Sequence, residues 1–194
     1  MPQKFNYIDF SNSITSTPRK SASLSKDRYI SNEFMDLEWE GIWTKTWLFT
    51  GIESDLAEVG DFFVYDIGRE SIVITRDEEM KISAFYNVCQ HRGNKIVTIE
   101  SGSFNKVSCP YHGWTYSLNG KLEHVPDREL FEGGVPCEEH SLKPVRVSIW
   151  AGLIFVNMDE KSSSLETFLG PIIDQLKPYK FEKMNLVKHQ TVSI

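Results

Sequence analysis

The sequence predicts a mainly β protein with antiparallel sheets, one helix near the N-terminus and short helices near the C-terminus. Three observations predict this class. The segments 61–67, 70–76 and 82–88 are rich in β-branched and aromatic residues that alternate along the chain, as strands with a buried face do. A helical spacing of apolar residues precedes these strands, between Asn32 and Thr46, and a helix-capping pattern follows them near Ser163.

The N-terminal helix is predicted from large apolar side chains that recur at spacings of three and four residues after Ser31. They are Met35, Trp39, Ile42, Trp43 and Trp47. We expect an amphipathic helix whose tryptophans pack into the core. Upstream, residues 9–26 are rich in Ser, Thr and Lys and poor in large apolar residues. Because so little apolar surface cannot offset the entropy of ordering, we expect a flexible arm there.

Turn residues divide the later strands into hairpins. Asn119-Gly120 lies inside WTYSLNGKLEHV and supplies the positive φ angles that a tight primed turn requires. Ala151-Gly152 separates two further strands, which are expected at 145–150 and 153–156.

Two short helices are predicted after the strands. Ser163 and Glu166 match a capping box, and Pro171 fits the first position of a second helical turn. The chain is therefore expected to divide into four parts. These are a flexible arm (1–27), a helix with its connection (28–60), the main β domain (61–160) and a helical connection that leads into one more strand (161–194).

Composition excludes several classes of function. The chain has 194 residues, 40% of them apolar, and a formal charge of -6. Its acidity disfavours nucleic acid and anionic membrane surfaces as partners. No apolar run approaches the roughly 18 residues that a membrane-spanning helix needs, and the polar N-terminal residues do not resemble a signal peptide, so we expect a cytoplasmic protein. Three cysteines in a reducing compartment favour metal binding over a disulfide framework.

Two segments carry candidate metal ligands. The first reads Cys89-Gln90-His91-Arg92-Gly93, and the second Cys109-Pro110-Tyr111-His112-Gly113-Trp114. Each segment supplies one thiolate and one imidazole, so that one iron could take both cysteines and a second iron both histidines. This division defines a Rieske-type [2Fe–2S] cluster. Zinc also accepts two Cys and two His, but its structural sites usually take a Cys pair from one segment and a His pair from another.

The same segments resemble the N-terminal Rieske domain in the α subunits of Rieske non-haem iron oxygenases. The resemblance extends to SNEFMDLEWEGIWTKTW, to EVGDFFVYDIGRESIVITRD, to the hairpin WTYSLNGKL and to AGLIFVNMDE, and covers roughly residues 28–185. It implies a Rieske-type antiparallel β-sandwich with a cluster-binding subdomain. The implied metal and cofactor ligands are Cys89, His91, Cys109 and His112.

One departure concerns the Rieske proteins of respiratory complexes, which have an extra cysteine in each loop and a serine that donates to a cluster sulfur. The matching positions here are Asn94, Tyr111 and Trp114. A lost donor leaves the more negative reduced state less stabilised, so a low reduction potential is expected.

The resemblance also implies parts that this sequence does not contain. We find no set of two histidines and one carboxylate for a mononuclear Fe(II) site, which the family carries in a C-terminal catalytic domain. The sequence is therefore interpreted as a fragment of an oxygenase α subunit. Implied partners are a reductase or ferredoxin, and further copies of the chain in a homotrimer or higher oligomer. Of the two histidines, His112 is predicted to be the electron exit toward a neighbouring subunit.

Two alternatives stay open at this stage: a stand-alone electron carrier of the Rieske ferredoxin type, and a zinc-binding interaction module. The remaining candidate side chains are predicted to lie outside the site. Acidic neighbours disfavour a reactive thiolate at Cys137, and His124 and His140 are expected to be solvated or hydrogen-bonded. His189 lies in the final strand-like run and has no second ligand near it in the sequence. Arg92 is either exposed at the loop tip or bridged within the domain.

Overall fold

The structure is a computed structural model that describes residues 25–135, 137–184, 187–188, 190 and 192. By its contacts the chain divides into two units, Met1–Met35 and Asp36–Ile194. The first unit contains α1 (Asp27–Ile30) and the start of α2 (Asn32–Glu38), where the Ser31 hydroxyl accepts a hydrogen bond from the Phe34 backbone N–H at 3.3 Å. The expected helix start after Ser31 is confirmed. The expected arm lies mostly outside the described residues.

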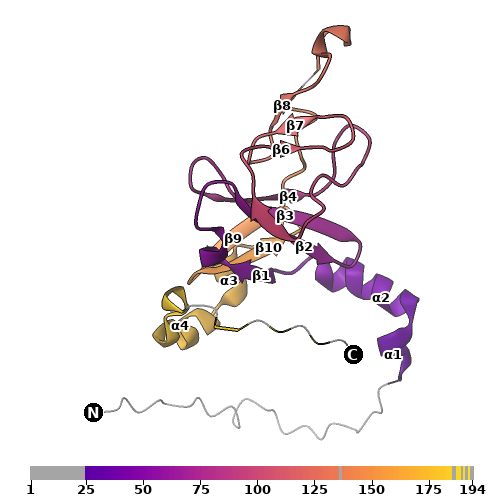
Figure 1. The fold of residues 1–194 in the computed structure, drawn as a ribbon. Coiled ribbons are helices and arrows are strands. Elements are labelled where there is room, and N and C mark those ends of the chain that lie inside the picture. Colours follow the sequence, from indigo (N-terminus) through magenta and orange to yellow (C-terminus); the bar gives the residue numbers. More distant parts are fainter. Residues whose placement is uncertain (1–24, 136, 185–186, 189, 191, 193–194) are drawn as a thin grey trace, which may run out of the picture. The chain divides into compact units, whose positions relative to one another are not determined.

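The second unit is built from three antiparallel sheets, and the mainly β fold class is confirmed. Their orders are β1-β10-β9, β4-β3-β2-β5 and β6-β7-β8. The strands of the first are β1 (Leu48–Ile52), β9 (Arg146–Trp150) and β10 (Leu153–Asn157). The second contains β2 (Asp61–Ile67), β3 (Glu70–Arg76), β4 (Ile82–Tyr86) and β5 (Ser101–Ser103), and the third β6 (Val107–Ser108), β7 (Thr115–Tyr116) and β8 (Leu122–His124). Figure 1 shows the four-stranded sheet between the other two.

Strand β3 is buried on both faces and so separates two apolar cores. Ile72 and Ile74 face the core between the first two sheets, which includes Ile154 of β10. Val73 points the other way, into the core shared with the third sheet, because successive side chains of a strand alternate. That second core contains Cys89 and Cys109. The candidate site therefore stands on a sheet that is packed from both sides.

The expected helical stripe is only partly correct. Trp39 and Trp47 are buried, but Met35 and Ile42 are 54% and 51% exposed. At Ile42 the reason is a π-helical turn at Trp39–Trp43, in which the Thr44 N–H donates to the Trp39 carbonyl five residues back at 3.1 Å. A π-helical turn holds an extra residue, so the 3.6-residue period does not continue through it.

The Asn119-Gly120 hairpin forms with a different turn from the one expected. Gly120 has φ +87°, whereas Asn119 is not among the residues with positive φ. The Gly120 N–H donates to the Ser117 carbonyl and the Ser117 N–H to the Lys121 carbonyl, both at 2.9 Å, which closes a three-residue loop. Such a loop needs positive φ only at its last residue.

The second expected hairpin and the late helices form, with one correction. Ala151 and Gly152 have φ +51° and +78°, as a two-residue primed turn requires. The helices are α3 (Leu165–Leu169) and α4 (Ile172–Leu176), the latter capped by Pro171. Ser164, and not Ser163, caps α3 by accepting from the Thr167 N–H. The Ser163 carbonyl is instead bound by the Trp47 indole N–H at 3.0 Å.

The strand-like run 187–194, with His189, lies mostly outside the described residues. Among the helices that are described, none combines the length and the apolar character needed to cross a bilayer.

Candidate metal centre

The two candidate ligand segments form backbone loops of the same build. In the first, the Cys89 N–H donates to the Asn94 carbonyl at 2.9 Å, and the Gly93 N–H returns to the Cys89 carbonyl at 3.0 Å. In the second, the Cys109 N–H donates to the Trp114 carbonyl at 2.8 Å and the Gly113 N–H to the Cys109 carbonyl at 3.0 Å. The two loops are therefore equivalent, although the spacing from Cys to His differs by one residue.

A glycine closes each loop because the backbone there is left-handed. Gly93 has φ +72° and Gly113 has φ +70°, a region that side-chain-bearing residues rarely adopt. Strands β6 and β7 flank the second loop, and a single bridge between Val88 and Lys95 flanks the first. Hairpin geometry thus sets both loops side by side at one end of the second core.

The sulfur ends of the loops are dry. Cys89 and Cys109 are 2% and 3% exposed. Burial raises the pKa of the Cys89 thiol above its ordinary value, and the adjacent Cys109 adds to this effect, while the Tyr116 hydroxyl acts in the opposite direction. Buried thiols that resist ionisation on their own become thiolates when a metal ion replaces their protons.

The imidazole ends are half-buried and lie together. The ring centroids of His91 and His112 are 4.7 Å apart, with an interplanar angle of 68°. The Trp114 indole lies parallel to His91 at 4.9 Å and 6°, and Tyr111 lies over His112 at 3.7 Å. Desolvation lowers the pKa of His91, followed by repulsion from His112, Arg92 and His140. A neutral imidazole, the form that binds metals, is favoured there.

One nitrogen of this pair has no partner. His112 Nδ1 is buried and makes no hydrogen bond within the described part of the chain. Leaving a buried polar atom unsatisfied costs about 1–3 kcal/mol. A buried imidazole nitrogen without a hydrogen-bond partner, in the same pair of loops as two buried thiols, is what a metal site offers. The donor set present therefore fits a metal group at this position.

Within the described residues, no group of three or more His, Cys, Asp or Glu side chains is placed to hold one metal ion. Structural zinc takes four ligands around a single ion, whereas a Rieske centre takes two protein ligands on each iron.

Sequence reasoning missed two contacts to the site. The Tyr116 hydroxyl lies 3.3 Å from Cys89 Sγ and accepts from the Gln90 N–H at 3.3 Å. The half-buried His140 ring lies 5.7 Å from that of Trp114, close enough to affect His91. A signal for Tyr116 existed, because strand alternation puts it on the same face as Trp114, directly after the second loop. His140 carried no comparable signal.

Asn94 is one of the loop positions that differ from the Rieske proteins of respiratory complexes, and its side chain can still donate toward a sulfur of the site. Asn94 Nδ2 lies 4.0 Å from Cys109 Sγ, the long limit for a hydrogen bond to sulfur. Three other side chains from the sequence analysis are not part of the ligand set. Arg92 and His124 are exposed, and the half-buried Cys137 donates through Sγ to the Val135 carbonyl at 3.4 Å.

Comparison with known proteins gives the class of the domain. Residues 46–139 match the family model of the Rieske [2Fe–2S] domain. This segment contains both loops, the second and third sheets, and strand β1 of the first sheet. Residues 46–139 therefore belong to the Rieske [2Fe–2S] domain family.

The relatives of the whole chain are oxygenase subunits. The glycine betaine monooxygenase oxygenase subunit of Pseudomonas aeruginosa is 30% identical over 89% of this chain and 40% of its own length. The biphenyl dioxygenase subunit alpha of Metapseudomonas furukawaii is 34% identical over 86% of this chain and 37% of its own. The chain spans about 40% of the curated relatives it matches.

Solved structures that resemble this chain are also oxygenases. The quaternary ammonium Rieske monooxygenase CntA with L-carnitine superposes with a TM-score of 0.74, at 34% identity, over 79% of this chain and 43% of that one. Naphthalene 1,2-dioxygenase from Rhodococcus sp. gives 0.72, at 35% identity, over 75% and 33%. The resemblance drawn from the motifs is confirmed: residues 46–139 match the Rieske [2Fe–2S] domain, and the chain is similar to oxygenase subunits.

Proposed function

We propose that this chain is the electron-transfer part of a Rieske oxygenase α subunit, with a [2Fe–2S] cluster held by Cys89 and Cys109 on one iron and by His91 and His112 on the other. The observation that carries the proposal is the pair of equivalent loops, which sets two buried thiols beside two half-buried imidazoles. When bound, such a cluster accepts and releases one electron at a time.

The side chains around the ligands have separate tasks. The apolar core around Cys89 and Cys109 excludes water from the sulfur end, and the Tyr116 hydroxyl, 3.3 Å from Cys89 Sγ, would donate to a ligating thiolate there. Trp114 fixes the plane of His91 by parallel packing. Packing and hydrogen bonds around a ligand hold its orientation and adjust the electronic properties of the metal.

His112 is the proposed electron exit. Its Nδ1 is buried, so the half-exposed ring presents its other edge, with Nε2, outward. We propose that this edge meets a carboxylate near a mononuclear Fe(II) site in a neighbouring copy of the full-length protein. A structure of CntA was described as revealing inter-subunit electron transfer, which supports this arrangement. In the complete assembly, His112 Nε2 should lie within about 3 Å of a carboxylate oxygen from another chain. If His91 makes that contact instead, the assignment is wrong.

The partners follow from the same proposal. A reductase or a ferredoxin supplies electrons, and the full-length protein assembles as a homotrimer or higher oligomer in the cytoplasm. The reaction is O2-dependent oxidation of an organic substrate. Named relatives act on glycine betaine, carnitine and biphenyl, so both quaternary amines and aromatic compounds fall within the range. The stand-alone carrier is less well supported, because the relatives above are all oxygenase subunits.

Metal and sulfide analysis tests the cofactor. The purified chain should contain two irons and two acid-labile sulfides and be red-brown. Cys89→Ser and Cys109→Ser should each lose the cluster, because a hydroxyl oxygen is a poor replacement for a soft thiolate. Cys137→Ser is the matched control, since its sulfur lies on the Val135 carbonyl outside the site. A colourless protein with one zinc, or equal iron loss in the control, would contradict the proposal.

A further inference from the structure

Asn87 is a polar side chain that is buried two residues before the first candidate ligand. It is 1% exposed, although asparagine is usually found at the protein surface. Ile96 and Val97, which follow the first ligand loop, belong with Cys89 to the second apolar core. Asn87 hydrogen-bonds to both of these residues, so it joins the point where the chain enters the loop to the point where the chain leaves it.

The Asn87 carboxamide uses every hydrogen-bonding position that it has. Its Oδ1 accepts from the Ile96 N–H at 3.1 Å and from the Val97 N–H at 2.8 Å. Its Nδ2 donates to the Val97 carbonyl at 2.7 Å and to the Ser71 hydroxyl at 3.2 Å. A carboxamide has two acceptor lone pairs and two N–H donors, so all four positions are satisfied. Because the group resembles a peptide unit, it serves the backbone of residues 96–97 as a neighbouring strand would.

The two ligand loops differ in how much backbone pairing supports them. The second loop is flanked by β6 and β7, which pair with each other at two positions. Among the described residues, the first loop is flanked by one bridge, between Val88 and Lys95. Lys95 also forms an ion pair with Asp66 at 3.2 Å, but both side chains are exposed, and such pairs contribute little. The contacts of Asn87 with residues 96–97 are therefore the buried polar closure of the first loop.

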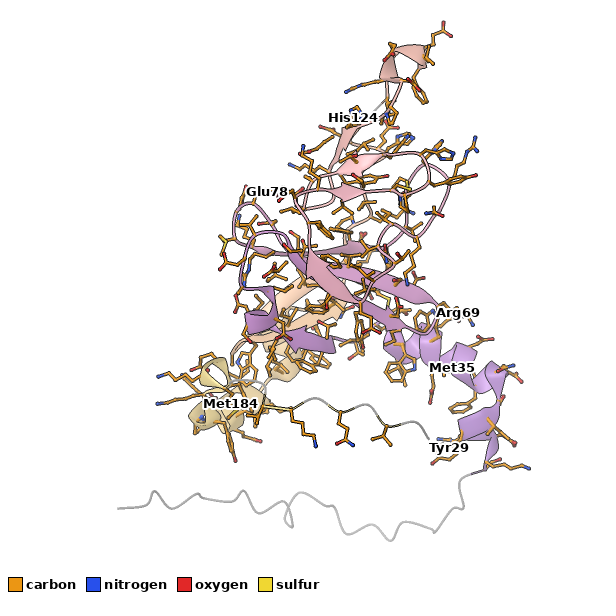
Figure 2. All side chains as sticks on the ribbon, in the orientation of Figure 1. Tyr29, Met35, Arg69, Glu78, His124 and Met184 are labelled. Carbon is orange, nitrogen blue, oxygen red and sulfur yellow. The ribbon has the colours of Figure 1, made fainter. Side chains whose placement is uncertain are left out.

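Asn87 is itself tied to the central sheet. Its backbone N–H donates to the Ser71 carbonyl at 2.8 Å, in addition to the side-chain contact with the Ser71 hydroxyl. Ser71 is the second residue of β3 and lies near the end of that strand that Arg69 marks in Figure 2. The next two residues of β3, Ile72 and Val73, are both 0% exposed and face opposite cores. Asn87 thus links the first loop to a strand that is packed on both faces.

We propose that Asn87 is a positioning residue for the cluster, which holds the first loop closed so that Cys89 and His91 keep the arrangement that two irons require. The inference rests on the proposed function, because that proposal makes these two side chains ligands. Without the carboxamide, the N–H groups of Ile96 and Val97 lose their buried partner, and the loop opens more often. Each opening gives water and chelators access to the sulfur of Cys89.

The first test uses the full-length protein with Asn87→Ala. An iron chelator should bleach the cluster about tenfold faster or more than in the unaltered protein. A factor of ten corresponds to about 1.4 kcal/mol, which lies within the range that one unsatisfied buried group costs. The backbone amides of Ile96 and Val97 should exchange their hydrogens faster by a similar factor. The electron paramagnetic resonance signal of the reduced cluster should also broaden, because the loop is no longer held in one arrangement.

Asn157→Ala is the matched control. Asn157 is also 1% exposed, but it lies in β10 of the first sheet, where its Oδ1 accepts from the Asp159 N–H at 2.9 Å. Its removal should lower the free energy of unfolding and leave the bleaching rate and the resonance signal unchanged. Ser71→Ala is a milder variant that removes one of the four hydrogen bonds of the Asn87 carboxamide and keeps the apolar core intact. It should speed bleaching by less than Asn87→Ala does, and it provides the test if Asn87→Ala does not fold.

The outcomes separate this inference from the proposed function. A two-iron cluster that bleaches at the same rate in Asn87→Ala as in the unaltered protein would overturn the inference alone. An equal increase in Asn157→Ala would overturn it as well, since general destabilisation would then explain the effect. If only Ser71→Ala folds, unchanged bleaching together with unchanged exchange at Ile96 and Val97 has the same meaning. Absence of a two-iron cluster from the unaltered protein would instead refute the proposed function.

Discussion

Replacing Tyr116 with phenylalanine removes one hydrogen bond to the proposed cluster. Tyr116 is 0% exposed, and its hydroxyl lies 3.3 Å from Cys89 Sγ. Burial raises the pKa of Tyr116 above the ordinary range of a phenol, with the adjacent Cys89 as a further cause, so the group stays protonated and donates. A donor stabilises the reduced state more than the oxidised one, because reduction adds negative charge near the sulfur.

The size of the effect follows from ordinary hydrogen-bond energies. A hydrogen bond to a charged group contributes about 1.5–3 kcal/mol, of which we assign about 1 kcal/mol to the difference between redox states. For a one-electron couple, a tenfold change in the equilibrium constant corresponds to about 1.4 kcal/mol and to about 59 mV. The substitution Tyr116→Phe should therefore lower the reduction potential by about 40 mV. A redox titration followed by electron paramagnetic resonance measures this shift.

The matched control is Tyr65→Phe. Tyr65 is a half-buried tyrosine of β2 that packs against the other core, away from both loops. Removal of the Tyr65 hydroxyl should leave the reduction potential unchanged. An unchanged or raised potential in Tyr116→Phe, or an equal fall in both variants, would refute the reasoning.

The remaining predictions concern the potential, the activity and the stability of the chain. The potential should lie near the low end of the Rieske range, roughly -150 mV, and fall further at high pH as bound imidazole loses a proton; a value well above zero contradicts this. Residues 1–194 alone should accept electrons from a reductase but consume no O2 with an organic substrate, and turnover would reveal an iron site we missed. Gly120→Ala should cost about 1 kcal/mol more in free energy of unfolding than Gly133→Ala, measured by urea titration. Both glycines have positive φ, but only at Gly120 would a Cβ press on Phe85, at 3.2 Å. Equal losses of unfolding free energy in the two variants would show that backbone strain alone, and not the contact with Phe85, determines the cost of the substitution.

Local patterns predicted most of the fold, and the errors have local causes as well. The runs of β-branched and aromatic residues placed β2 and β3 correctly, although β3 is buried on both faces and its burial does not alternate. The helical stripe failed at Ile42 because a π-helical turn is not encoded in apolar spacing. The cap of α3 is Ser164, one residue later than expected, and the Ser163 carbonyl accepts from the Trp47 indole, far away in the sequence.

The candidate ligands could be found from sequence because each Cys and His pair lies within one short loop. The side chains that surround the ligands could not be found in this way. Tyr116 reaches Cys89 across 27 positions, and Trp114 of the second loop covers His91 of the first. Contacts of this kind depend on how two loops face each other, which the strand pairing decides and no single motif contains.

The membership of Cys89 and Cys109 in an apolar core has a consequence for the speed of electron transfer. Under the proposed ligation, the sulfur end of the centre is surrounded by close-packed side chains that cannot turn their dipoles when the charge changes. Water that could reorient is confined to the imidazole edge, where His91 and His112 are half-exposed. A rigid, dry environment lowers the reorganisation needed for each transfer. The electron can then move quickly in either direction between partners of similar potential, and the direction is decided by the proteins that dock at the edge.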